Sequence, residues 1–366
     1  MIQMPITVVV GGQYGGEGKG KVVAHLCRNR GFDVTVRCGG PNSGHTITLN
    51  GRQVVLRQVP AGVVNPCAKL FLAAGCLIDQ DVLSKEIELF DLHPDRLKID
   101  HNAVIINKDY AQKEKEAQLD SEIGSTCTGT GFAVAERALR KKDVELAKDI
   151  PSLKPYLAKV SEEIMSYYIN GNQIVVEGTQ GFGLSVYHSP YYPYATSRDT
   201  TASGFLSEAG ISPLSVSDIV MVLRTFPIRV GGKSGPLPQE ITWKVVQLGS
   251  GYPYEPQEFT TVTKRLRRVA RFDVEIVKMA TIANMPTQIA LMGVDYLDYK
   301  NKGATSFNQL TERTKEFIFW LKRQIETQIG LIGTGPTDSE LIDRFGECEY
   351  EQERDRARVT KTVPMS

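Results

Sequence analysis

The chain has 366 residues, 41% of them apolar, which is enough for a sizeable core. Its 43 basic and 42 acidic residues give a net charge of +1. This balance argues against a protein whose main task is binding bulk nucleic acid or an anionic membrane, because both rely on summed positive charge. The longest apolar run, residues 71–78, is broken by Gly75 and is far too short to span a bilayer.

Six cysteines show no CxxC pair and no metal-ligand spacing, which favours reduced thiols over a disulfide framework or a zinc site. The N-terminal stretch has no basic region ahead of its apolar run. We therefore expect no signal peptide and a cytoplasmic location.

Strand and helix patterns alternate along the chain, which is typical of an α/β fold. Strand-like segments are residues 6–10, 33–38, 46–49, 54–57, 70–74, 97–106 and 174–177. Helical segments are residues 19–30, 79–90, 108–119, 151–169 and, longest, 309–328. Residues 218–225, 240–248, 272–284 and 287–291 continue the alternation. We predict one large domain, residues 1–366, with a mostly parallel central sheet flanked by helices and interrupted by loop excursions.

Local signals refine this outline. Asn50-Gly51 between two strand-like runs predicts a hairpin, and Asp79 or Asp81 is a plausible helix cap. Residues 124–131 and 178–204 are rich in glycine and hydroxyl side chains without periodicity, as expected of active-site loops.

The most informative segment is VVVGGQYGGEGKGKVV, residues 8–23. A buried strand leads into six glycines and two lysines and then into a helix, an arrangement that suits phosphate binding by backbone N–H groups and a helix N-terminus. Residues 15–21 fit the first seven positions of a Walker A loop, but the eighth, which holds Mg²⁺ through a hydroxyl, is Val22. An ordinary P-loop enzyme is disfavoured; the alternative is a glycine-rich turn without function.

This segment resembles the N-terminal signature of adenylosuccinate synthetases, roughly QWGDEGKGK. Seven further blocks agree with that family in order along the chain: GGPNSGHT (39–46), GSTCTGTG (124–131), VEGTQG (176–181), YPYATSRDTTASG (192–204), RVGGKSGPLPQE (229–240), TTVTKRLRRVARFD (260–273) and IGTGP (332–336). The resemblance implies the family's fold and its two-step reaction. A nucleoside triphosphate phosphorylates O6 of a 6-oxopurine nucleotide, and the amino group of L-aspartate then displaces that phosphate.

The resemblance also implies a role for individual residues. Expected catalytic residues are His45, Lys19, Gln180 and Gly16. Expected at the triphosphate are Gly15, Glu17, Gly18, Lys19, Gly20, Lys21, His45, Thr46, Arg267, Asp295, Gly333, Gly335 and Pro336. Expected at the substrate nucleotide are Asn42, Ser125, Thr126, Arg140, Gln180, Thr196, Val230 and Gly231. Expected at L-aspartate are Thr261, Thr263 and Arg265. The carbonyl of Gly44 is expected to bind the Mg²⁺ cofactor, and Arg140 to reach across a homodimer interface.

The sequence departs from the family at two positions. Gly16 stands where the signature has a catalytic aspartate, which in the usual enzyme accepts the purine N1 proton and ligates Mg²⁺. A small residue at that position is similar to the phage-type relative that joins dGMP and aspartate, the 2-aminoadenylosuccinate synthetase of the diaminopurine (Z) genome pathway. We therefore expect dGMP as substrate. Ordinary synthesis from IMP, GTP and aspartate is the main alternative, and an inactive homologue is another.

The second departure concerns the phosphate donor. The family selects GTP with a TKLD block, in which the lysine packs on guanine and the aspartate binds its N1 and N2 donors. Here residues 292–295 read MGVD, so Asp295 is kept while the lysine has become Gly293. We therefore expect ATP or dATP to serve, with GTP still possible; Asp295 is otherwise a plain strand-end carboxylate.

The sequence disfavours two other functional classes. A regulatory GTPase-like switch needs a Walker A hydroxyl and an intact guanine motif, and both are degraded here. A nucleic-acid-binding module would use the five basic residues within positions 264–271, but the net charge of +1 disfavours it.

Overall fold

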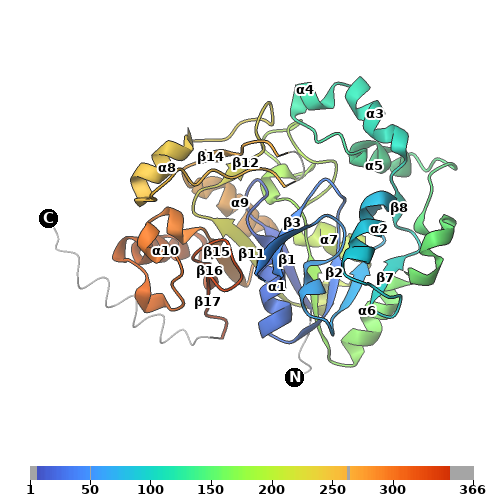
Figure 1. Cartoon of the computed structure of the whole chain (residues 1–366), viewed down its shortest axis with the longest axis horizontal. Coiled ribbons are helices and arrows are strands. Elements are labelled where there is room, and N and C mark those ends of the chain that lie inside the picture. The colour runs from blue at the N-terminus through green and yellow to red at the C-terminus, as the bar shows by residue number, and fades with distance from the viewer. Residues whose placement is uncertain (1–5, 50, 262–263, 347–366) are drawn as a thin grey trace.

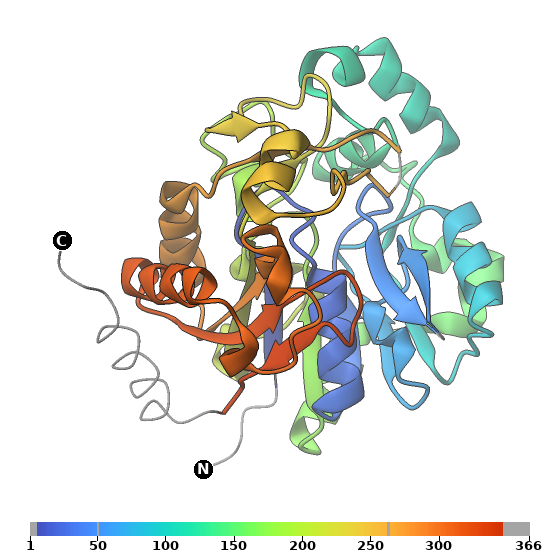
Figure 2. The ribbon, with the colours of Figure 1, turned by 60° about the vertical axis from the view of Figure 1, so that its left-hand side comes forward.

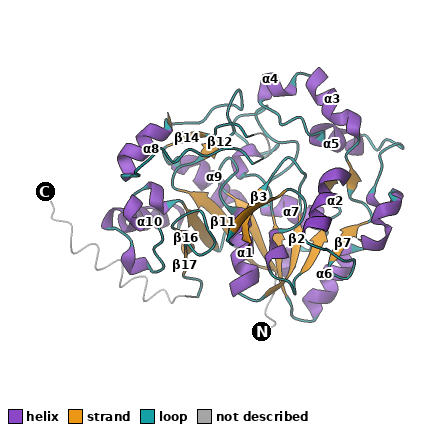
Figure 3. Cartoon of the chain, viewed as in Figure 1, coloured by secondary structure: helices purple, strands orange, loops and turns teal. Residues whose placement is uncertain are grey.

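The computed structural model describes residues 6–49, 51–261 and 264–346. Its centre is a ten-stranded sheet (Figures 1 and 3). In spatial order the strands are β17 (Leu341–Asp343), β16 (Gln328–Gly333), β15 (Gln288–Met292), β11 (Val216–Arg224), β1 (Ile6–Gly11), β10 (Gln173–Glu177), β2 (Phe32–Arg37), β5 (Lys69–Leu72), β7 (Leu97–Asp100) and β9 (Leu157–Ala158). Each neighbouring pair is parallel except β16 and β17, so the predicted mostly parallel sheet is confirmed.

The central strands are apolar runs buried on both faces, as parallel strands covered by helices should be. All six residues of β1 are buried, and so are the last four of β10. The larger helices beside the sheet are α1 (Lys19–Asn29), α2 (Gln80–Leu89), α6 (Val160–Ile169), α7 (Ala202–Ala209), α9 (Val274–Asn284) and α10 (Glu312–Ile325).

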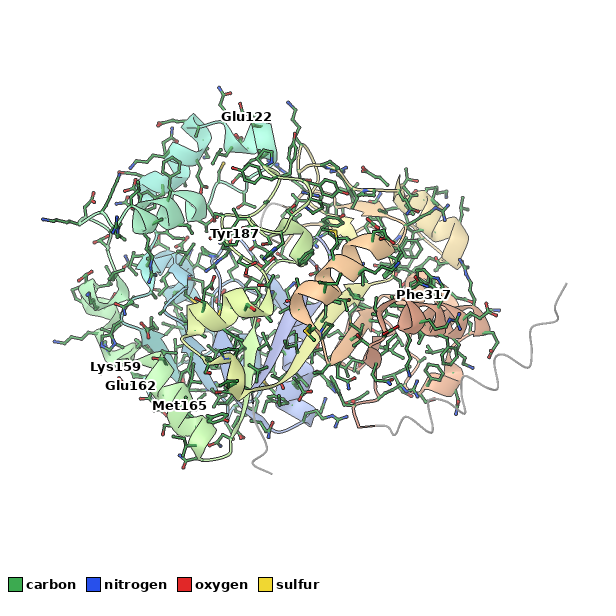
Figure 4. The ribbon with its side chains drawn as sticks, turned by 180° about the vertical axis from the view of Figure 1, so that it is seen from behind. Glu122, Lys159, Glu162, Met165, Tyr187 and Phe317 are labelled. Atoms are coloured by element: carbon green, nitrogen blue, oxygen red, sulfur yellow. The ribbon has the colours of Figure 1, made fainter. Side chains whose placement is uncertain are left out.

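The connections place these helices on opposite faces. The first crossover runs from β1 through α1 toward β2, whereas a later one runs from β10 through α7 back toward β11. Because such crossovers are right-handed, the reversal of direction puts α1 and α7 on opposite sides of the sheet. Figure 2 shows α1 against the central strands, and Figure 4 shows the rear face, with Lys159, Glu162 and Met165 near one end and Phe317 of α10 near the other.

Two excursions lie over the upper edge of the sheet in Figure 1. One contains α3 (Lys108–Glu116), α4 (Leu119–Ile123) and α5 (Thr130–Ala138), with a small core of its own around Tyr110 and Ala133. The other contains β12 (Ile228–Arg229), β13 (Glu240–Ile241), β14 (Arg268–Ala270) and α8 (Trp243–Ser250). Two short pairs complete the elements, β3 (His45–Leu49) with β4 (Arg52–Leu56) and β6 (Leu77–Ile78) with β8 (Val104–Ile105).

Several local predictions are confirmed and two are wrong. The β3–β4 hairpin forms, and the Asp79 carboxylate caps α2 by accepting from the backbone of Asp81 and Val82. The expected strand 97–106 is instead β7 and β8 in different sheets, because the chain turns where Asp100 accepts from the Asn102 backbone. The expected helix 151–169 begins only at α6; a 3-10 helix containing Pro155 and then β9 precede it, since proline cannot donate the hydrogen bond that an α-helix interior needs.

No helix in residues 6–49, 51–261 or 264–346 combines the length and apolarity that crossing a membrane requires.

The edge strand β17 is tied to α1 through Asp343. Its carboxylate contacts His25 Nε2 at 2.6 Å and Arg30 Nε at 2.8 Å. Although burial raises the pKa of this carboxyl, the hydrogen bonds from His25 and Arg30 outweigh it and hold the pKa below its ordinary value. The ionised carboxylate therefore stabilises the folded chain.

We predict that Asp343→Asn lowers the free energy of unfolding at pH 7 by up to about 1 kcal/mol, the range of partly exposed ion pairs. Because the folded-state pKa is depressed, this stabilisation is fully present above the unfolded pKa of about 3.9 and is lost as the pH falls below it. The difference in Tm between the variant and the parent should therefore shrink from pH 7 toward pH 3. Asp91→Asn, in an exposed pair with His93, is the matched control and should change Tm little. An undiminished difference at pH 3 would contradict the assignment.

Candidate active site

Many of the residues predicted at the site follow the carboxyl ends of parallel strands. Strands β1, β2, β10, β11, β15 and β16 all end at one edge of the sheet, and β1 lies where the strand order reverses direction. Ligands of open α/β sheets bind at such a switch point. The edge therefore brings together segments that are far apart in the sequence.

The phosphate loop between β1 and α1 is folded around the Glu17 carboxylate. Glu17 Oε1 accepts from the backbone N–H groups of Gln13 at 3.2 Å and Gly15 at 2.8 Å, while Oε2 contacts Lys19 Nζ at 2.7 Å. Gly15, Gly16 and Gly18 have φ values of 86°, 69° and 107°, which favour glycine. Val22, at the position of the Walker A hydroxyl, is fully buried in the core and offers no metal ligand.

The loop reaches the C-terminal segment through Lys21. Its Nζ donates to the carbonyls of Gly335 at 2.8 Å and Glu340 at 2.7 Å. Burial lowers the pKa of Lys21 to about 8. On the same side, a Cβ atom on Gly333 would lie 2.5 Å from Met292 Sδ, and one on Gly18 would lie 3.3 Å from Met292 Cγ. The structure thus brings residues 18, 21, 333 and 335 of the predicted triphosphate set together.

His45 begins β3 and packs against the first turn of α1, where a Cβ atom on Gly20 would lie 2.7 Å from that of His45 and 3.3 Å from the Thr46 carbonyl. Its Nδ1 contacts the Glu177 carboxylate, and Arg37 Nη1 lies 2.9 Å from Glu177 Oε1 and 3.0 Å from His45 Nδ1. Glu177 Oε2 also accepts from the Ala61 backbone at 2.7 Å.

The protonation of this group follows from its neighbours. Burial raises the pKa of Glu177, but His45 and Arg37 outweigh it and hold that pKa below its usual range. Burial and then Arg37 lower the pKa of His45 to about 4, so the ring is neutral at pH 7 with Nδ1–H facing Glu177. Nε2 is buried and has no hydrogen-bond partner among the described residues. An anionic phosphoryl group beside Nε2 would favour the protonated ring, which then donates to that group.

Gln180 follows β10, and its backbone has a φ of 61°, a left-handed conformation that is uncommon for residues other than glycine. Its carbonyl accepts from Lys19 Nζ, and its Nε2 donates to Thr196 Oγ1 at 2.7 Å. Its Oε1 is buried without a partner among the described residues. A strained backbone and an unsatisfied buried acceptor are typical of a ligand site.

The space beside Gly16 is filled by Arg267. A Cβ atom on Gly16 would overlap Arg267 Nη1 and lie 2.9 Å from Ile228 Cδ1. Arg267 Nε donates to the Phe259 carbonyl at 3.2 Å. A carboxylate at position 16 therefore has to displace this guanidinium or pair with it, so the position is not an empty cavity.

The predicted aspartate and metal residues also meet. A Cβ atom on Gly44 would collide with Thr261 Oγ1. Arg265 Nη1 would lie 3.9 Å from a Cβ atom on Gly232, directly after the predicted Val230 and Gly231. Thr263 lies outside the described residues. Thr261 therefore lies beside the His45 loop, and Arg265 lies beside the loop that holds residues 230–232.

The remaining substrate residues lie on the α3–α5 excursion or near it. A Cβ atom on Gly40 would lie 3.3 Å from Asn42 Oδ1. Ser125 Oγ accepts from the Cys127 backbone at 3.2 Å, Thr126 Oγ1 lies 3.3 Å from Thr128 Oγ1, and Gly124 packs against Ser234. Arg140 is exposed just beyond α5, and its role across a dimer interface stays a prediction.

The charged residues behind the site were not predicted from the sequence. Arg37 and Glu177 hold His45, and both are buried strand-end residues. Arg224, at the end of β11, bonds the Gly16 carbonyl at 3.2 Å and pairs with Glu258. The sequence signal for these residues is a charged side chain at the end of a mainly apolar strand, because buried charges are rare unless they are paired.

The family model for adenylosuccinate synthetase matches residues 8–147 and 141–302. The chain belongs to the adenylosuccinate synthetase family. It is 40% identical over 343 residues to the adenylosuccinate synthetase of Archaeoglobus fulgidus, covering 93% of this chain and 98% of the relative. It is 40% identical over 352 residues to that of Methanocaldococcus jannaschii, covering 95% and 99%. These alignments cover nearly the whole of both relatives, so the length of this chain does not distinguish it from ordinary synthetases.

Two solved structures share the fold. The fully ligated adenylosuccinate synthetase of Plasmodium falciparum has a TM-score of 0.81 at 22% identity, covering 93% of this chain and 99% of that one. The succinoaminodeoxyadenylate synthetase of cyanophage S-2L, bound to dGMP and dATP as an energy donor, has a TM-score of 0.76 at 25% identity, covering 97% and 99%. The protein is therefore a ligase of the adenylosuccinate synthetase type, which condenses aspartate with a purine nucleotide.

We predict that His45→Asn and Lys19→Gln each lower kcat by more than about 10²-fold, since both groups face charge that develops during phosphoryl transfer. The sequence places both in polar loops, where substitution should leave folding unchanged, but the structure buries both side chains. Lys19→Gln also leaves Glu17 buried without its cation, so it should lower Tm more than His45→Asn does. Steady-state kinetics with thermal unfolding checks both. Activity within a few-fold of the parent would contradict the assignment.

Proposed function

We propose that the enzyme joins L-aspartate to dGMP and yields N6-succino-2-amino-2′-deoxyadenylate. The observation that carries the proposal is Gly16, where the family signature has an aspartate. The 2-amino group of guanine adjoins N1, where the aspartate side chain would crowd it. The cyanophage S-2L relative, whose structure contains dGMP, supports this substrate.

The reaction has two steps. The donor's terminal phosphoryl group is transferred to O6 of the purine, and the proton on N1 is released as the 6-phosphoryl intermediate forms. The free amine of aspartate then attacks C6, the C6–O6 bond breaks, inorganic phosphate leaves, and the amine loses a proton.

The side chains of the site suit these steps. Lys19 is expected to exchange its contacts with Glu17 and the Gln180 carbonyl for the donor's terminal phosphate. His45 Nε2 and Gln180 Oε1 are both buried without a hydrogen-bond partner among the described residues, and we assign both atoms to the reacting purine. Arg265 and Thr261 would bind the carboxylates of aspartate, for which a guanidinium fork is geometrically apt.

Mg²⁺ is implied by the family. No group of three His, Cys, Asp or Glu residues that could cage a metal exists within the described ranges. A site with few protein ligands suits Mg²⁺ that is carried mainly by phosphates and waters, because that ion dehydrates reluctantly. The Gly44 carbonyl is the protein ligand we assign. When bound, the ion would neutralise charge on the phosphates.

The donor we propose is ATP or dATP. Gly293 stands where the family has the lysine that packs on guanine, and the cyanophage enzyme is bound to dATP as an energy donor. GTP is the alternative, as in the ordinary enzymes.

The main competing function is ordinary adenylosuccinate synthesis from IMP. It is favoured by the 40% identity to archaeal enzymes that carry that name. The two functions differ in one testable property, the purine accepted, because IMP lacks the 2-amino group. A small residue at position 16 favours the larger base.

We predict that dGMP supports aspartate-dependent phosphate release and that IMP is a poor substrate. Phosphate release should be measured with dGMP, GMP, IMP and dAMP, each with ATP or GTP and with aspartate omitted as the control. A kcat/KM for IMP at least tenfold above that for dGMP would overturn the proposal.

We predict that Gly16→Asp lowers the ratio of dGMP to IMP turnover by at least about tenfold, because misplacing a bound base by about 1 Å can cost on the order of 10²-fold. Gly16 has φ 69° and faces Arg267, so any side chain there strains the loop. Gly16→Ala is the matched control, since it carries the same backbone strain without a carboxylate. The ratio should change with Asp and much less with Ala. An unchanged or higher ratio in Gly16→Asp would exclude Gly16 as the selectivity determinant.

A further inference from the structure

The Asp295 carboxyl is engaged from within the protein. Asp295 lies in the short 3-10 turn after β15 and is 3% exposed. The hydroxyl of Tyr252, which follows α8 in the chain, donates to Asp295 Oδ2 and is itself buried. Burial raises the pKa of Asp295. The carboxyl that survives from the family's guanine motif is thus already hydrogen-bonded.

This pair adjoins the segments that are predicted to bind the phosphate donor. Gly293 donates its backbone N–H to the Gly333 carbonyl at 3.0 Å, and Gly303 donates to the Thr334 carbonyl at 3.2 Å. Lys21 of the phosphate loop binds the carbonyl of Gly335. The turn that carries Asp295 is therefore joined to the same C-terminal segment that the phosphate loop holds.

Aromatic packing fixes the Tyr252 hydroxyl on Asp295. The Tyr252 ring lies 4.5 Å from the Tyr299 ring and 5.6 Å from the Tyr296 ring, measured between centroids. Lys302 Nζ lies over the rings of Tyr252 at 5.6 Å and Tyr299 at 5.7 Å. Such neighbours hold the phenol in one orientation, so releasing Asp295 requires moving a packed ring.

The chemistry of the two purines makes this pairing selective. Guanine presents two adjacent donors, N1–H and the 2-amino group, and these need a free, ionised carboxylate as acceptor. Adenine presents an acceptor at N1 and has no 2-amino group. A carboxyl that is buried and already accepting from a phenol serves guanine poorly, whereas adenine does not require it.

We propose that Tyr252 is a specificity-determining residue for the phosphate donor, because its hydroxyl occupies the carboxyl that would otherwise bind guanine. The inference rests on the adenine-donor part of the proposed function and assigns it to a residue. It does not depend on which purine monophosphate accepts the phosphoryl group.

The test is binding of ADP and GDP, each with Mg²⁺, to the whole chain by calorimetry. The parent should bind ADP more tightly. Tyr252→Phe keeps the ring packed and frees Asp295 to accept from guanine. It should therefore reduce the preference for ADP over GDP at least about tenfold, because a site that hydrogen-bonds a ligand group discriminates strongly against a ligand that lacks it. Tyr254→Phe, whose ring is 5.6 Å from that of Tyr252, is the matched control and should change the preference less than twofold.

A second substitution separates the carboxyl from general repacking. Asp295→Asn should leave the parent's preference unchanged, because the amide oxygen still accepts from Tyr252. In the Tyr252→Phe background it should restore the ADP preference, which is the coupling that a double-mutant cycle measures. Unfolding without nucleotide verifies that each variant is folded.

The outcomes are distinct. Tighter GDP binding by the parent would overturn both the adenine-donor proposal and this inference. The inference alone would be overturned if the parent prefers ADP but the ADP preference of Tyr252→Phe stays within twofold of the parent's or equals that of Tyr254→Phe. A loss of GDP binding in Asp295→Asn of the parent would show that Asp295 already binds guanine and would also overturn it.

Discussion

The buried Glu177 carboxylate is the constraint on which the site depends. It has no exposed surface, and a lone charge in such a place would be strongly destabilising. Arg37 from β2, His45 from β3 and the Ala61 backbone all converge on it, so three segments are fixed relative to β10. Removing Arg37 would leave the buried Glu177 charge without its cation, and the Glu177 carboxylate in turn fixes the His45 ring through Nδ1. Gln180, three residues after Glu177, inherits this fixed position and meets Lys19 of the phosphate loop.

The surroundings of Gly16 are a second constraint on the site. The structure shows that losing the signature aspartate leaves no vacancy, because the Arg267 guanidinium and Ile228 stand there. A guanidinium beside residue 16 attracts negative charge on a bound purine, whereas the aspartate of the family signature would repel it. If dGMP is the substrate, its 2-amino group and the Arg267 guanidinium have to share this space, so the selectivity of the site depends on positions 16 and 267 together.

The sequence predicted the architecture, which depends on local patterns, and it named most of the residues that the structure gathers at the candidate site. Apolar runs ending in glycine indicated β1 and the phosphate loop, and the family blocks indicated His45, Gln180 and Asp295. It failed where the deciding contact joins distant segments. Nothing near residue 16 in the chain indicates that Arg267 covers it, and nothing near Asp295 indicates the Tyr252 hydroxyl. A local signal explains the error in residues 151–169, because Pro155 favours a 3-10 helix and the α-helix begins only at Val160.

The most direct test of the central claim is a competition experiment. Equal concentrations of dGMP and IMP are incubated with the enzyme, limiting ATP, Mg²⁺ and isotopically labelled L-aspartate, and the two succinylated products are separated by mass. The ratio of products reports the ratio of kcat/KM directly, independent of enzyme concentration. The account predicts that the 2-amino product exceeds the product from IMP at least tenfold. An excess of adenylosuccinate would contradict it and would identify an ordinary synthetase with an unusual phosphate loop.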